Sequence, residues 1–533
     1  MRFLLVNPYY PIAEGPSPPL GIAFLGAALE RAGVEVKVLD LVVYPYSKMM
    51  LESVLDTFDP HFVGSTAVTM SFDNAIQVIS DVKSINPKIY TVMGGPHVTF
   101  CARETMEAFP ELDFVVLGEG EETIVDLIKM SENGRKWNEI RGVAYRDGSS
   151  LHCTDVKKTS LDVDSLPLPA RHLLPLGRYR ALNMPISLTT SRGCPFKCIF
   201  CVGRKMVGAN VRYRSAKPVV DEMESLHKLG FPQINVADDL FTANKKHCIE
   251  ICDEILDRGL AIKWSSFARV DTVSPEVMKK MKEAGCYSVS FGVETANAEI
   301  LKTIRKGITI SQVIDAVKIC NDAGIQPSAS FILGLPGETP ETLKETVEFG
   351  KKLKKMGVIY GFHLLAPFPG TRIREEAEAY GIRILTNDWR EYHANRAIVE
   401  TASVKKNMLD EIAIEWEEDI NKWLGHLNEM IKNGSASEEE AFPLENLERT
   451  VIAYDLMMGD ILKDYGSWHR EEDLNLSDTE LIKKLVSRIP ESFDHPRNTI
   501  EKTLNYSKNK GNLSVKREEG RIEWEWVDYL NSF

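Results

Sequence analysis

Residues 191–201 read Ser-Arg-Gly-Cys-Pro-Phe-Lys-Cys-Ile-Phe-Cys and place Cys194, Cys198 and Cys201 in a CxxxCxxC pattern directly after the β-rich run ISLTT at 186–190. Three thiolates on one short loop can bind three irons of a 4Fe-4S cluster and leave the fourth iron open. A structural zinc site usually takes four protein ligands, and no nearby cysteine or histidine completes such a set. The stretch therefore favours an iron-sulfur cluster at the end of a strand.

The residues around this stretch alternate between short β-rich runs and helical patterns up to about residue 381. Alternation of this kind predicts parallel strands that are covered by helices. Six strands with intervening helices predict a partial (β/α)6 barrel over residues 186–381. The strands are expected at 186–190, 233–237, 263–268, 288–294, 327–334 and 361–368.

Residues 1–150 show the same alternation and are predicted to form a separate Rossmann-like α/β domain. Its strands are expected at 3–7, 35–41, 62–68, 89–93 and 114–117, with a first helix at 20–31. Ligands of an open parallel sheet bind beyond the carboxyl ends of the strands. The loops there contain Gly94-Gly95-Pro96-His97 and Gly118-Glu119-Gly120, which are either tight turns or a place where a bulky ligand approaches the backbone. No GxGxxG motif follows the first strand, which argues against a dinucleotide.

The rest of the chain is predicted to form a linker and a third domain. A hairpin at 141–150 and the proline-rich stretch 163–176 indicate a linker over residues 151–185. From 382 to 533 no run compares with the barrel strands, and a mainly helical C-terminal domain is expected, with a polar loop at 433–440. Apolar residues recur every three or four positions and predict one long amphipathic helix: Leu409, Ile412, Trp416, Ile420, Trp423 and Leu427.

Composition excludes several classes of protein. The formal net charge of -13 argues against binding along a nucleic-acid backbone. No apolar stretch approaches the roughly 20 residues that cross a bilayer, and the short N-terminal apolar run is typical of a buried strand rather than a secretory signal. Nine cysteines are too few for a disulfide scaffold. A cytoplasmic location is expected.

The CxxxCxxC pattern, with the aromatic Phe200 just before its last cysteine, resembles the signature of the radical S-adenosylmethionine (SAM) superfamily. The resemblance covers residues 186–381. It implies that the open iron chelates SAM and that one electron, from a donor such as ferredoxin or flavodoxin, yields a 5'-deoxyadenosyl radical. It also implies SAM-binding roles for residues at the strand ends: Asp238, Asp239, Arg269, Glu294, Gly334 and Leu335, besides Phe200. Asp238 and Asp239 depart from the glycine-glycine-glutamate of many relatives, and Arg269 is equally well explained by a surface ion pair.

The order of the two α/β modules resembles the cobalamin-binding radical SAM enzymes over roughly 380 residues. The resemblance implies a methyltransferase that uses methylcobalamin and a second SAM; a cyclase or oxygen-inserting enzyme, or a cobalamin-binding redox sensor, are the alternatives. It assigns cobalamin to the loops that follow the strands, namely Asn7, Pro8, Tyr9, Thr66, Thr69, Gly94, Gly95, His97, Gly118, Glu119 and Gly120. Neither the substrate nor a catalytic side chain is identified. The acidic helical tail favours a protein, a peptide or a polar metabolite as the substrate. A protein or peptide carbon is preferred, as in relatives that modify methyl-coenzyme M reductase.

A DxHxxG match at 59–64 does not predict a histidine ligand to cobalt. In domains that supply such a ligand the motif follows the first strand, whereas here it precedes the third. His61 is therefore expected at the amino edge of the sheet, about 16 Å from the carboxyl edge for five residues at about 3.3 Å each. His97 lies at the correct edge, where ligation and a loop hydrogen bond are both open.

Overall fold

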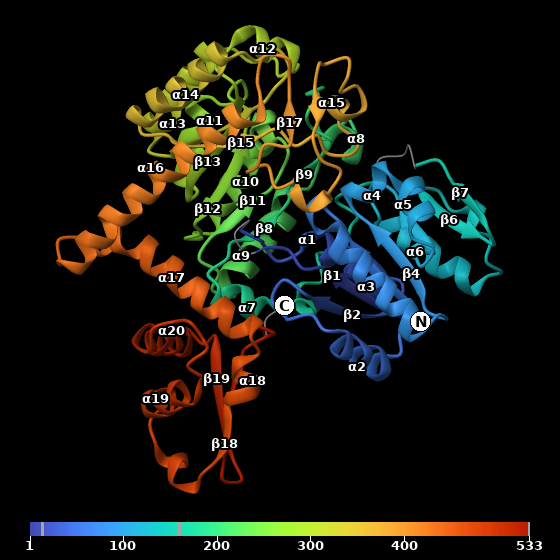
Figure 1. Cartoon of the computed structure of the whole chain (residues 1–533), viewed down its shortest axis with the longest axis vertical. Helices are drawn as coiled ribbons and strands as arrows, with labels where there is room; N and C mark the ends of the chain where they lie inside the picture. Colours follow the sequence, from blue (N-terminus) through green and yellow to red (C-terminus); the bar gives the residue numbers. More distant parts are fainter. Residues whose placement is uncertain (12–14, 157–160, 531–533) are drawn as a thin grey trace.

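The computed structural model describes residues 1–11, 15–156 and 161–530, which form two parallel α/β domains and a C-terminal region (Figure 1). Residues 157–160 of the predicted linker and the last three residues of the predicted third domain lie outside this range. None of the helices in the described part of the chain is both long and apolar enough to cross a membrane.

The N-terminal sheet has the strand order β2-β1-β3-β4-β5-β6-β7. Its first five strands are parallel, and the hairpin β6–β7 adds to the edge in antiparallel fashion. All five predicted parallel strands are present within one or two residues of their expected bounds. The strands are β1 (Arg2–Asn7), β2 (Glu35–Asp40), β3 (Phe62–Thr66), β4 (Tyr90–Gly94), β5 (Phe114–Val116), β6 (Val143–Asp147) and β7 (Ser150–Cys153).

Helices cover both faces of this sheet: α1 (Leu20–Arg31), α2 (Lys48–Phe58), α3 (Phe72–Ile85), α4 (Pro96–Phe100), α5 (Ala102–Ala108) and α6 (Glu121–Glu132). Because β1 lies between β2 and β3, the chain reverses its winding direction at β1. The crevice beyond the carboxyl ends of β1 and β3 is the place where a sheet of this order binds its ligand.

The second sheet has the order β15-β14-β13-β12-β11-β8, and every pair is parallel. The six strands confirm the predicted partial barrel, whose edge strands β8 and β15 stay unpaired with each other. They are β8 (Ile186–Leu188), β11 (Ile234–Val236), β12 (Trp264–Ala268), β13 (Cys286–Glu294), β14 (Gln326–Leu333) and β15 (Ile359–Leu364). The helices around them are α8 (Gly203–Val207), α9 (Ala216–Lys228), α10 (Lys245–Asp257), α11 (Pro275–Glu283), α12 (Ala298–Thr303), α13 (Ile310–Ala323), α14 (Pro340–Lys355) and α15 (Arg372–Glu375).

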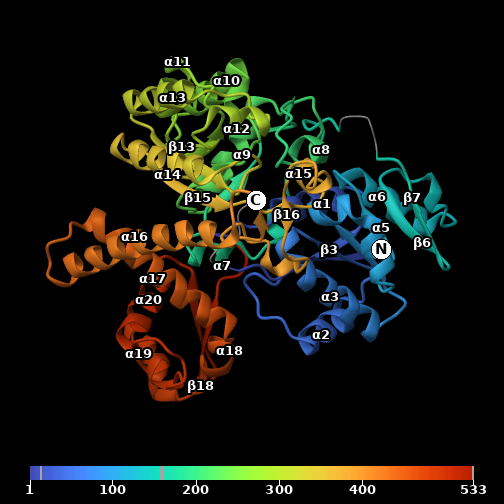
Figure 2. The ribbon, with the colours of Figure 1, turned by 45° about the horizontal axis from the view of Figure 1, so that its top comes forward.

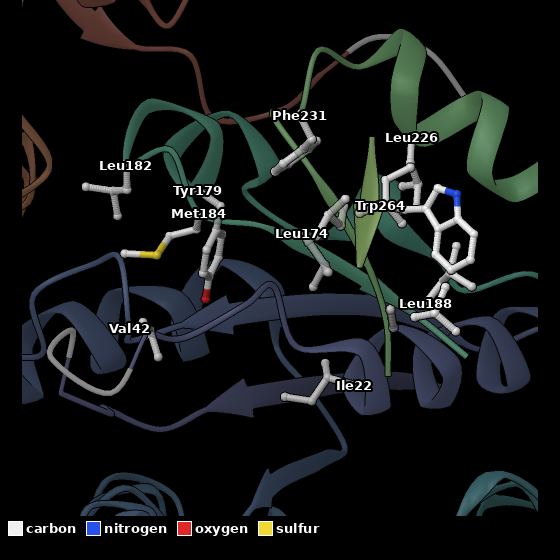
Figure 3. Packing of buried hydrophobic residues seen from close by; sticks show 14 of the residues in the cluster. Ile22, Val42, Leu174, Tyr179, Leu182, Met184, Leu188, Leu226, Phe231 and Trp264 are labelled. Atoms are coloured by element: carbon white, nitrogen blue, oxygen red, sulfur yellow. The ribbon is translucent and has the colours of Figure 1, made fainter. Parts of the chain in front are cut away.

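The linker packs between the two α/β domains (Figure 3). Its helix α7 (Leu176–Ala181) carries Tyr179, which is fully buried and points toward the N-terminal sheet. Upstream of α7, the buried Arg171 forms an ion pair with Glu222 of α9 at 2.6 Å. The linker therefore joins the cores of the two domains instead of acting as a flexible tether.

The C-terminal region contains the predicted amphipathic helix as α16 (Lys406–Lys432), followed by α17 (Glu438–Met458), α18 (Ile461–Tyr465), α19 (Asp478–Arg488) and α20 (Arg497–Asn509). The region is mainly helical as expected, and it also contains strands that the sequence analysis did not identify. Besides the short pair β16 (Arg383–Ile384) and β17 (Val399–Glu400), β18 (Ser467–His469), β19 (Leu513–Glu518) and β20 (Arg521–Trp526) form an antiparallel sheet. Ile522, Trp524 and Trp526 of β20 alternate with charged residues and are buried, which is the period-two pattern of a half-buried strand.

The segment before α16 does not belong to a detached cap. Its part around Trp389–Glu391 lies against α3 of the N-terminal domain (Figures 1 and 2), and the Trp389 ring contacts the His97 ring at 4.8 Å between centroids. The end of the chain also returns to the domain junction, where Asp528 accepts hydrogen bonds from Arg178 at 2.7 Å and Tyr44 at 2.6 Å.

Candidate functional site

The three predicted cluster cysteines lie on a loop that backbone hydrogen bonds hold in place. The buried Ile199 is the anchor, since its N–H donates to Ile304 O at 3.2 Å and its carbonyl accepts from Ile373 N at 3.0 Å. Cys194 N–H donates to Gly208 O at 3.1 Å. The loop thus connects the ends of β8, α12 and α15 through main-chain contacts.

The thiols suit an iron-sulfur cluster better than a single metal ion. Among the described residues, no three His, Cys, Asp or Glu side chains converge on one point as ligands of a single ion would. In a 4Fe-4S cluster each cysteine binds a different iron, so convergence is not required. Burial raises the pKa of Cys194, Cys198 and Cys201 in the metal-free chain, and binding to iron would deprotonate them. Gly203 N–H already donates to Cys201 Sγ at 3.3 Å.

The two predicted carboxylates after β11 have different surroundings. Asp238 is 2% exposed, and its oxygens accept hydrogen bonds from Thr190 N at 2.6 Å, Thr190 Oγ1 at 2.5 Å and Ser191 Oγ at 2.6 Å. Its carboxylate therefore holds the start of the cysteine loop through both oxygens. Asp239 lines the large cavity described below, and burial raises its pKa.

Arg269 lies under the cysteine loop with its guanidinium already paired. It donates to Asp271 Oδ1 at 2.9 Å and Oδ2 at 3.0 Å, and to Lys306 O at 2.8 Å. The guanidinium also stacks 3.6 Å from the centre of the Phe196 ring. In this structure Arg269 supports the loop, because the side that would grip a carboxylate is occupied by Asp271.

Glu294 ends β13 in a left-handed backbone conformation, with φ of 70°. Such a conformation in a non-glycine residue is costly and is concentrated at functional sites. Glu294 forms a buried ion pair with Lys306 at 2.6 Å, and Lys306 Nζ lies 5.9 Å from the centre of the Phe200 ring. Sequence reasoning missed Lys306, although its position directly before Gly307 at the end of a helix was visible.

The Gly334–Glu338 loop after β14 closes on itself. Glu338 Oε2 accepts hydrogen bonds from Gly334 N at 2.6 Å and Leu335 N at 3.0 Å, while Oε1 has no partner among the described residues. Burial raises the pKa of Glu338 to about 8, so the carboxyl group is mostly protonated at neutral pH. This arrangement fixes the backbone of Gly334 and Leu335, the two residues assigned to SAM.

A cavity of about 370 Å³ lies where the two α/β domains meet. Its walls come from the carboxyl ends of β1, β3, β4 and β5 on one side and from the cysteine-loop side of the barrel on the other. The lining residues include Leu5, Gly64, Thr66, Gly94, Gly95, Gly118, Glu119 and Gly120 of the first domain and Ser191, Arg192, Ala237 and Asp239 of the second. We refer to this space as the interdomain cavity.

Glycines allow the strand ends that line the interdomain cavity to pack closely. Gly95 has φ of 101°, and a Cβ atom there would lie 2.7 Å from Ala67 O, so only glycine is accommodated. A Cβ atom at Gly64 would lie 2.7 Å from the Phe3 ring. These two positions therefore need glycine for local packing, and both line the cavity.

Six of the eleven residues assigned to cobalamin line the cavity: Thr66, Gly94, Gly95, Gly118, Glu119 and Gly120. Asn7, Pro8, Tyr9, Thr69 and His97 are not among its lining residues. The Asn7 amide donates to Asp40 at 2.7 Å, and Thr69 Oγ1 lies 3.3 Å from His97 Nδ1. These two pairs fix the loops that surround the cavity.

His97 is 1% exposed and packs 4.2 Å from the Phe72 ring centre on one side and against Trp389 on another. Burial lowers its pKa to about 4, and the Arg374 charge contributes, so His97 is neutral at pH 7. His61 lies at the amino edge as expected, since its Nδ1 accepts a 3.2 Å hydrogen bond from Arg2 N at the start of β1.

An ion-pair network joins the cysteine loop to the first domain. Arg192 lies 3.1 Å from Glu119 and 2.7 Å from Glu121, and Arg212 lies 2.9 Å from Glu119. Sequence reasoning assigned Glu119 to cobalamin and missed both arginines, although Arg192 stands beside the cysteines in the sequence. The network spans the mouth of the interdomain cavity and sets the distance between its two walls.

Comparisons with known proteins agree with this geometry. Residues 188–350 match the radical SAM superfamily and residues 13–128 match the B12 binding domain. An uncharacterized methyltransferase of Pyrococcus horikoshii is 40% identical over 378 residues, which cover 70% of this chain and 81% of the relative. The anaerobic magnesium-protoporphyrin IX monomethyl ester cyclase of Cereibacter sphaeroides is 34% identical over 65% of this chain and 59% of its own length.

Two solved structures share the fold. The cobalamin-dependent SAM radical enzyme OxsB has a TM-score of 0.68 at 20% identity, covering 96% of this chain and 81% of OxsB. The radical SAM methyltransferase TsrM of Kitasatospora setae has a TM-score of 0.64 at 23% identity, covering 77% of this chain and 80% of TsrM. The matched domains imply a 4Fe-4S cluster, SAM and cobalamin. The chain therefore belongs to the cobalamin-binding radical SAM enzymes.

Proposed function

We propose that this enzyme transfers a methyl group to an unactivated carbon. The observation that carries the proposal is the interdomain cavity, whose walls combine the glycine loops of the B12 domain with Ser191 and Asp239 beside the cluster cysteines. Methyl transfer to a substrate radical needs the radical and methylcobalamin to meet in one space, and this cavity borders both the cluster side and the cobalamin loops. The 40% identical methyltransferase relative supports the same reaction.

The chain's own residues bind and orient the reacting groups. Cys194, Cys198 and Cys201 would hold the cluster, Glu294 and the Gly334–Leu335 backbone would hold SAM, and the glycine loops would hold methylcobalamin. When bound, these groups supply hydrogen abstraction and a transferable methyl group. Glu294 and Leu335 are buried, so this part of the site is shielded from solvent.

Glu294 can accept hydrogen bonds from the ribose of SAM without losing its ion pair. Lys306 holds Oε1, and Oε2 is the remaining acceptor. The paired Lys306 ammonium lies 5.9 Å from the centre of the Phe200 ring, beside the cluster loop.

We further propose a protein or peptide as the substrate and ferredoxin or flavodoxin as the reductant. Support for a polypeptide comes from an apolar groove of about 480 Å³ between α16, α17 and the linker, with Trp423 and Leu447 more than half exposed. Such exposed apolar surface is typical of contact sites for other proteins.

The test uses SAM with a deuterated methyl group. The reconstituted enzyme is incubated anaerobically with this SAM and an extract of host cells that lack the gene, and peptides are analysed by mass spectrometry. We expect labelled peptides together with 5'-deoxyadenosine and S-adenosylhomocysteine. Without labelled product, methyl transfer to protein is refuted.

A ring-forming or oxygen-inserting reaction is the second candidate, because a cyclase is 34% identical over 65% of the chain. Such a reaction would yield 5'-deoxyadenosine and a modified product that carries no deuterium. The same experiment therefore separates the two reactions by the label.

A further inference from the structure

Cations without acidic partners surround the outer side of the cysteine loop. Lys197 lies between Cys194 and Cys198 and is exposed. Arg305 is exposed just after α12, and its carbonyl lies 3.8 Å from Cys198 Sγ. Arg204 of α8 donates a hydrogen bond to Pro195 O of the same loop. Within the described part of the chain, none of these three side chains forms an ion pair.

Three acidic residues of the flanking segments are already paired with basic neighbours. Glu375 pairs with Lys205 at 2.8 Å, and Glu376 pairs with Arg372 at 2.8 Å. Glu299 lies 3.9 Å from Lys302 on α12. The unpaired charges of Lys197, Arg204 and Arg305 therefore make this face positive, although the whole chain carries a formal net charge of -13.

This positive face lies on the outer side of the cysteine loop, which differs from the side that faces the interdomain cavity. The inner side of the loop faces the interdomain cavity through Ser191 and Arg192. The outer side exposes Pro195 and Lys197 to solvent. A protein that docks on the outer side approaches the cluster ligands without entering the space for substrate and cobalamin.

We propose that Lys197, Arg204 and Arg305 form the docking face for an acidic one-electron carrier protein. In the step served by this face, the reduced carrier loses one electron and the cluster gains it, with no bond made or broken. The inference rests on the proposed function only in requiring the cluster, and it holds for methyl transfer and for cyclisation alike.

Charge is the recognition signal in this proposal. Opposite net charges steer association and raise its rate by about 10 to 1000-fold at low ionic strength. Added salt screens that attraction, since the Debye length is about 10 Å at 0.1 M. A nucleic acid is also anionic but carries no electron, so the test measures electron transfer and binding together.

The experiment compares wild type with Lys197→Glu/Arg305→Glu. The rate of cluster reduction by reduced flavodoxin, an acidic carrier, is followed by stopped-flow absorbance, and binding of oxidised flavodoxin is measured by calorimetry at two ionic strengths. We expect at least about a tenfold loss of both rate and affinity in the variant, and a steep fall with salt in wild type only. Reduced methyl viologen, a small cation, is expected to reduce both proteins at similar rates.

Two further variants make the result specific. Lys318→Glu/Lys354→Glu makes the same change in net charge at exposed positions of α13 and α14, and it is expected to behave like wild type. Arg305→Glu alone leaves the cysteine loop sequence intact and is expected to show a partial loss.

Three results would overturn the proposal. The first is an unchanged rate of reduction by flavodoxin in Lys197→Glu/Arg305→Glu. The second is an equal loss of this rate in Lys318→Glu/Lys354→Glu. The third is an equal loss of the rate with methyl viologen in Lys197→Glu/Arg305→Glu, which would mean that the cluster loop is damaged. A failure to find methylated product would leave the docking result standing, so the two proposals are tested separately.

Discussion

The Tyr179 hydroxyl group donates a 2.8 Å hydrogen bond to Asp40 Oδ2, and this bond ties the linker helix to the carboxyl end of β2. Both side chains are fully buried. Asp40 Oδ1 also accepts from the Asn7 amide at 2.7 Å and from Val42 N at 3.2 Å, whereas Tyr179 is the partner of Oδ2. The contact therefore couples the core of the B12 domain to the linker.

We predict that Tyr179→Phe lowers the free energy of unfolding by about 1–3 kcal/mol at pH 7, because Oδ2 is then buried without a partner. Burial raises the pKa of Asp40 from 3.8 to about 6, so the native state holds a proton between these values that the unfolded state has lost. The contribution of Asp40 to stability therefore falls as pH rises from about 4 to 6 and is lowest above pH 6. The Tyr179→Phe deficit should shrink at pH 5, as urea denaturation at the two pH values will measure.

Tyr46→Phe is the matched control. It removes a 2.6 Å hydrogen bond to Asp81. Burial acts to raise the pKa of Asp81, but hydrogen bonds from Tyr46 and Gln77 outweigh burial and hold it below its usual value. Asp81 is thus ionised at pH 5 and pH 7, and the control deficit should be equal at both. A Tyr179→Phe deficit that is also equal at both would contradict the assignment.

Cys198→Ala is predicted to abolish reductive cleavage of SAM, since two thiolates cannot retain the cluster in its catalytic form. The measurement is 5'-deoxyadenosine after anaerobic reconstitution, with iron content determined in parallel. Cys153→Ala removes an exposed cysteine of the β6–β7 hairpin and should leave both values unchanged. Wild-type cleavage by Cys198→Ala would disprove the cluster assignment.

Gly94→Val is predicted to weaken cobalamin binding by at least about tenfold, which corresponds to about 1.4 kcal/mol. Gly94 lines the interdomain cavity, and a Cβ atom there meets Val116 O at an ordinary 3.7 Å, so the strand tolerates the side chain while the cavity is filled. Spectrophotometric titration measures the affinity. Gly94→Ala should have a smaller effect, and iron content should be unchanged in both variants.

The main elements could be predicted because their patterns are local. Hydrophobic alternation located the parallel strands of both domains, and the CxxxCxxC spacing located the cluster loop. The β19–β20 hairpin was missed because its strands are rich in charged residues, yet Ile522, Trp524 and Trp526 show the alternation. A shorter window centred on these aromatic residues would have found β20.

The partners of the site residues could not be predicted, because most of them come from distant parts of the chain. The family resemblance and its place after the third strand gave Arg269 a role with SAM, but whether its guanidinium is free depends on Asp271 and on Phe196 of another loop. Asp238 was assigned in the same way, although Thr190 and Ser191 use both of its oxygens. Hydrogen-bond saturation is a property of the folded site and leaves no periodic signal in sequence.

The last prediction is that cobalamin binds without a histidine of this chain as its lower cobalt ligand. His61 accepts a hydrogen bond from Arg2 N at the amino edge of the sheet, and the five residues of β3, at about 3.3 Å each, separate it from the carboxyl edge by about 16 Å. His97 is neutral and at the correct edge, but its ring is enclosed by Phe72 and Trp389, and it is not a lining residue of the interdomain cavity. Ligation by His97 would require this aromatic contact to open.

Electron paramagnetic resonance of the bound cob(II)alamin form gives a direct measurement, because an axial nitrogen splits each cobalt line into three. We expect no nitrogen splitting in wild type and unchanged spectra in His61→Ala and His97→Gln, with free base-on cob(II)alamin as the positive control. A splitting that disappears in His97→Gln would show that the ring leaves Trp389 when cobalamin binds. A splitting that disappears in His61→Ala would mean that cobalamin binds at the opposite edge of the sheet, and the interdomain cavity would then need another ligand.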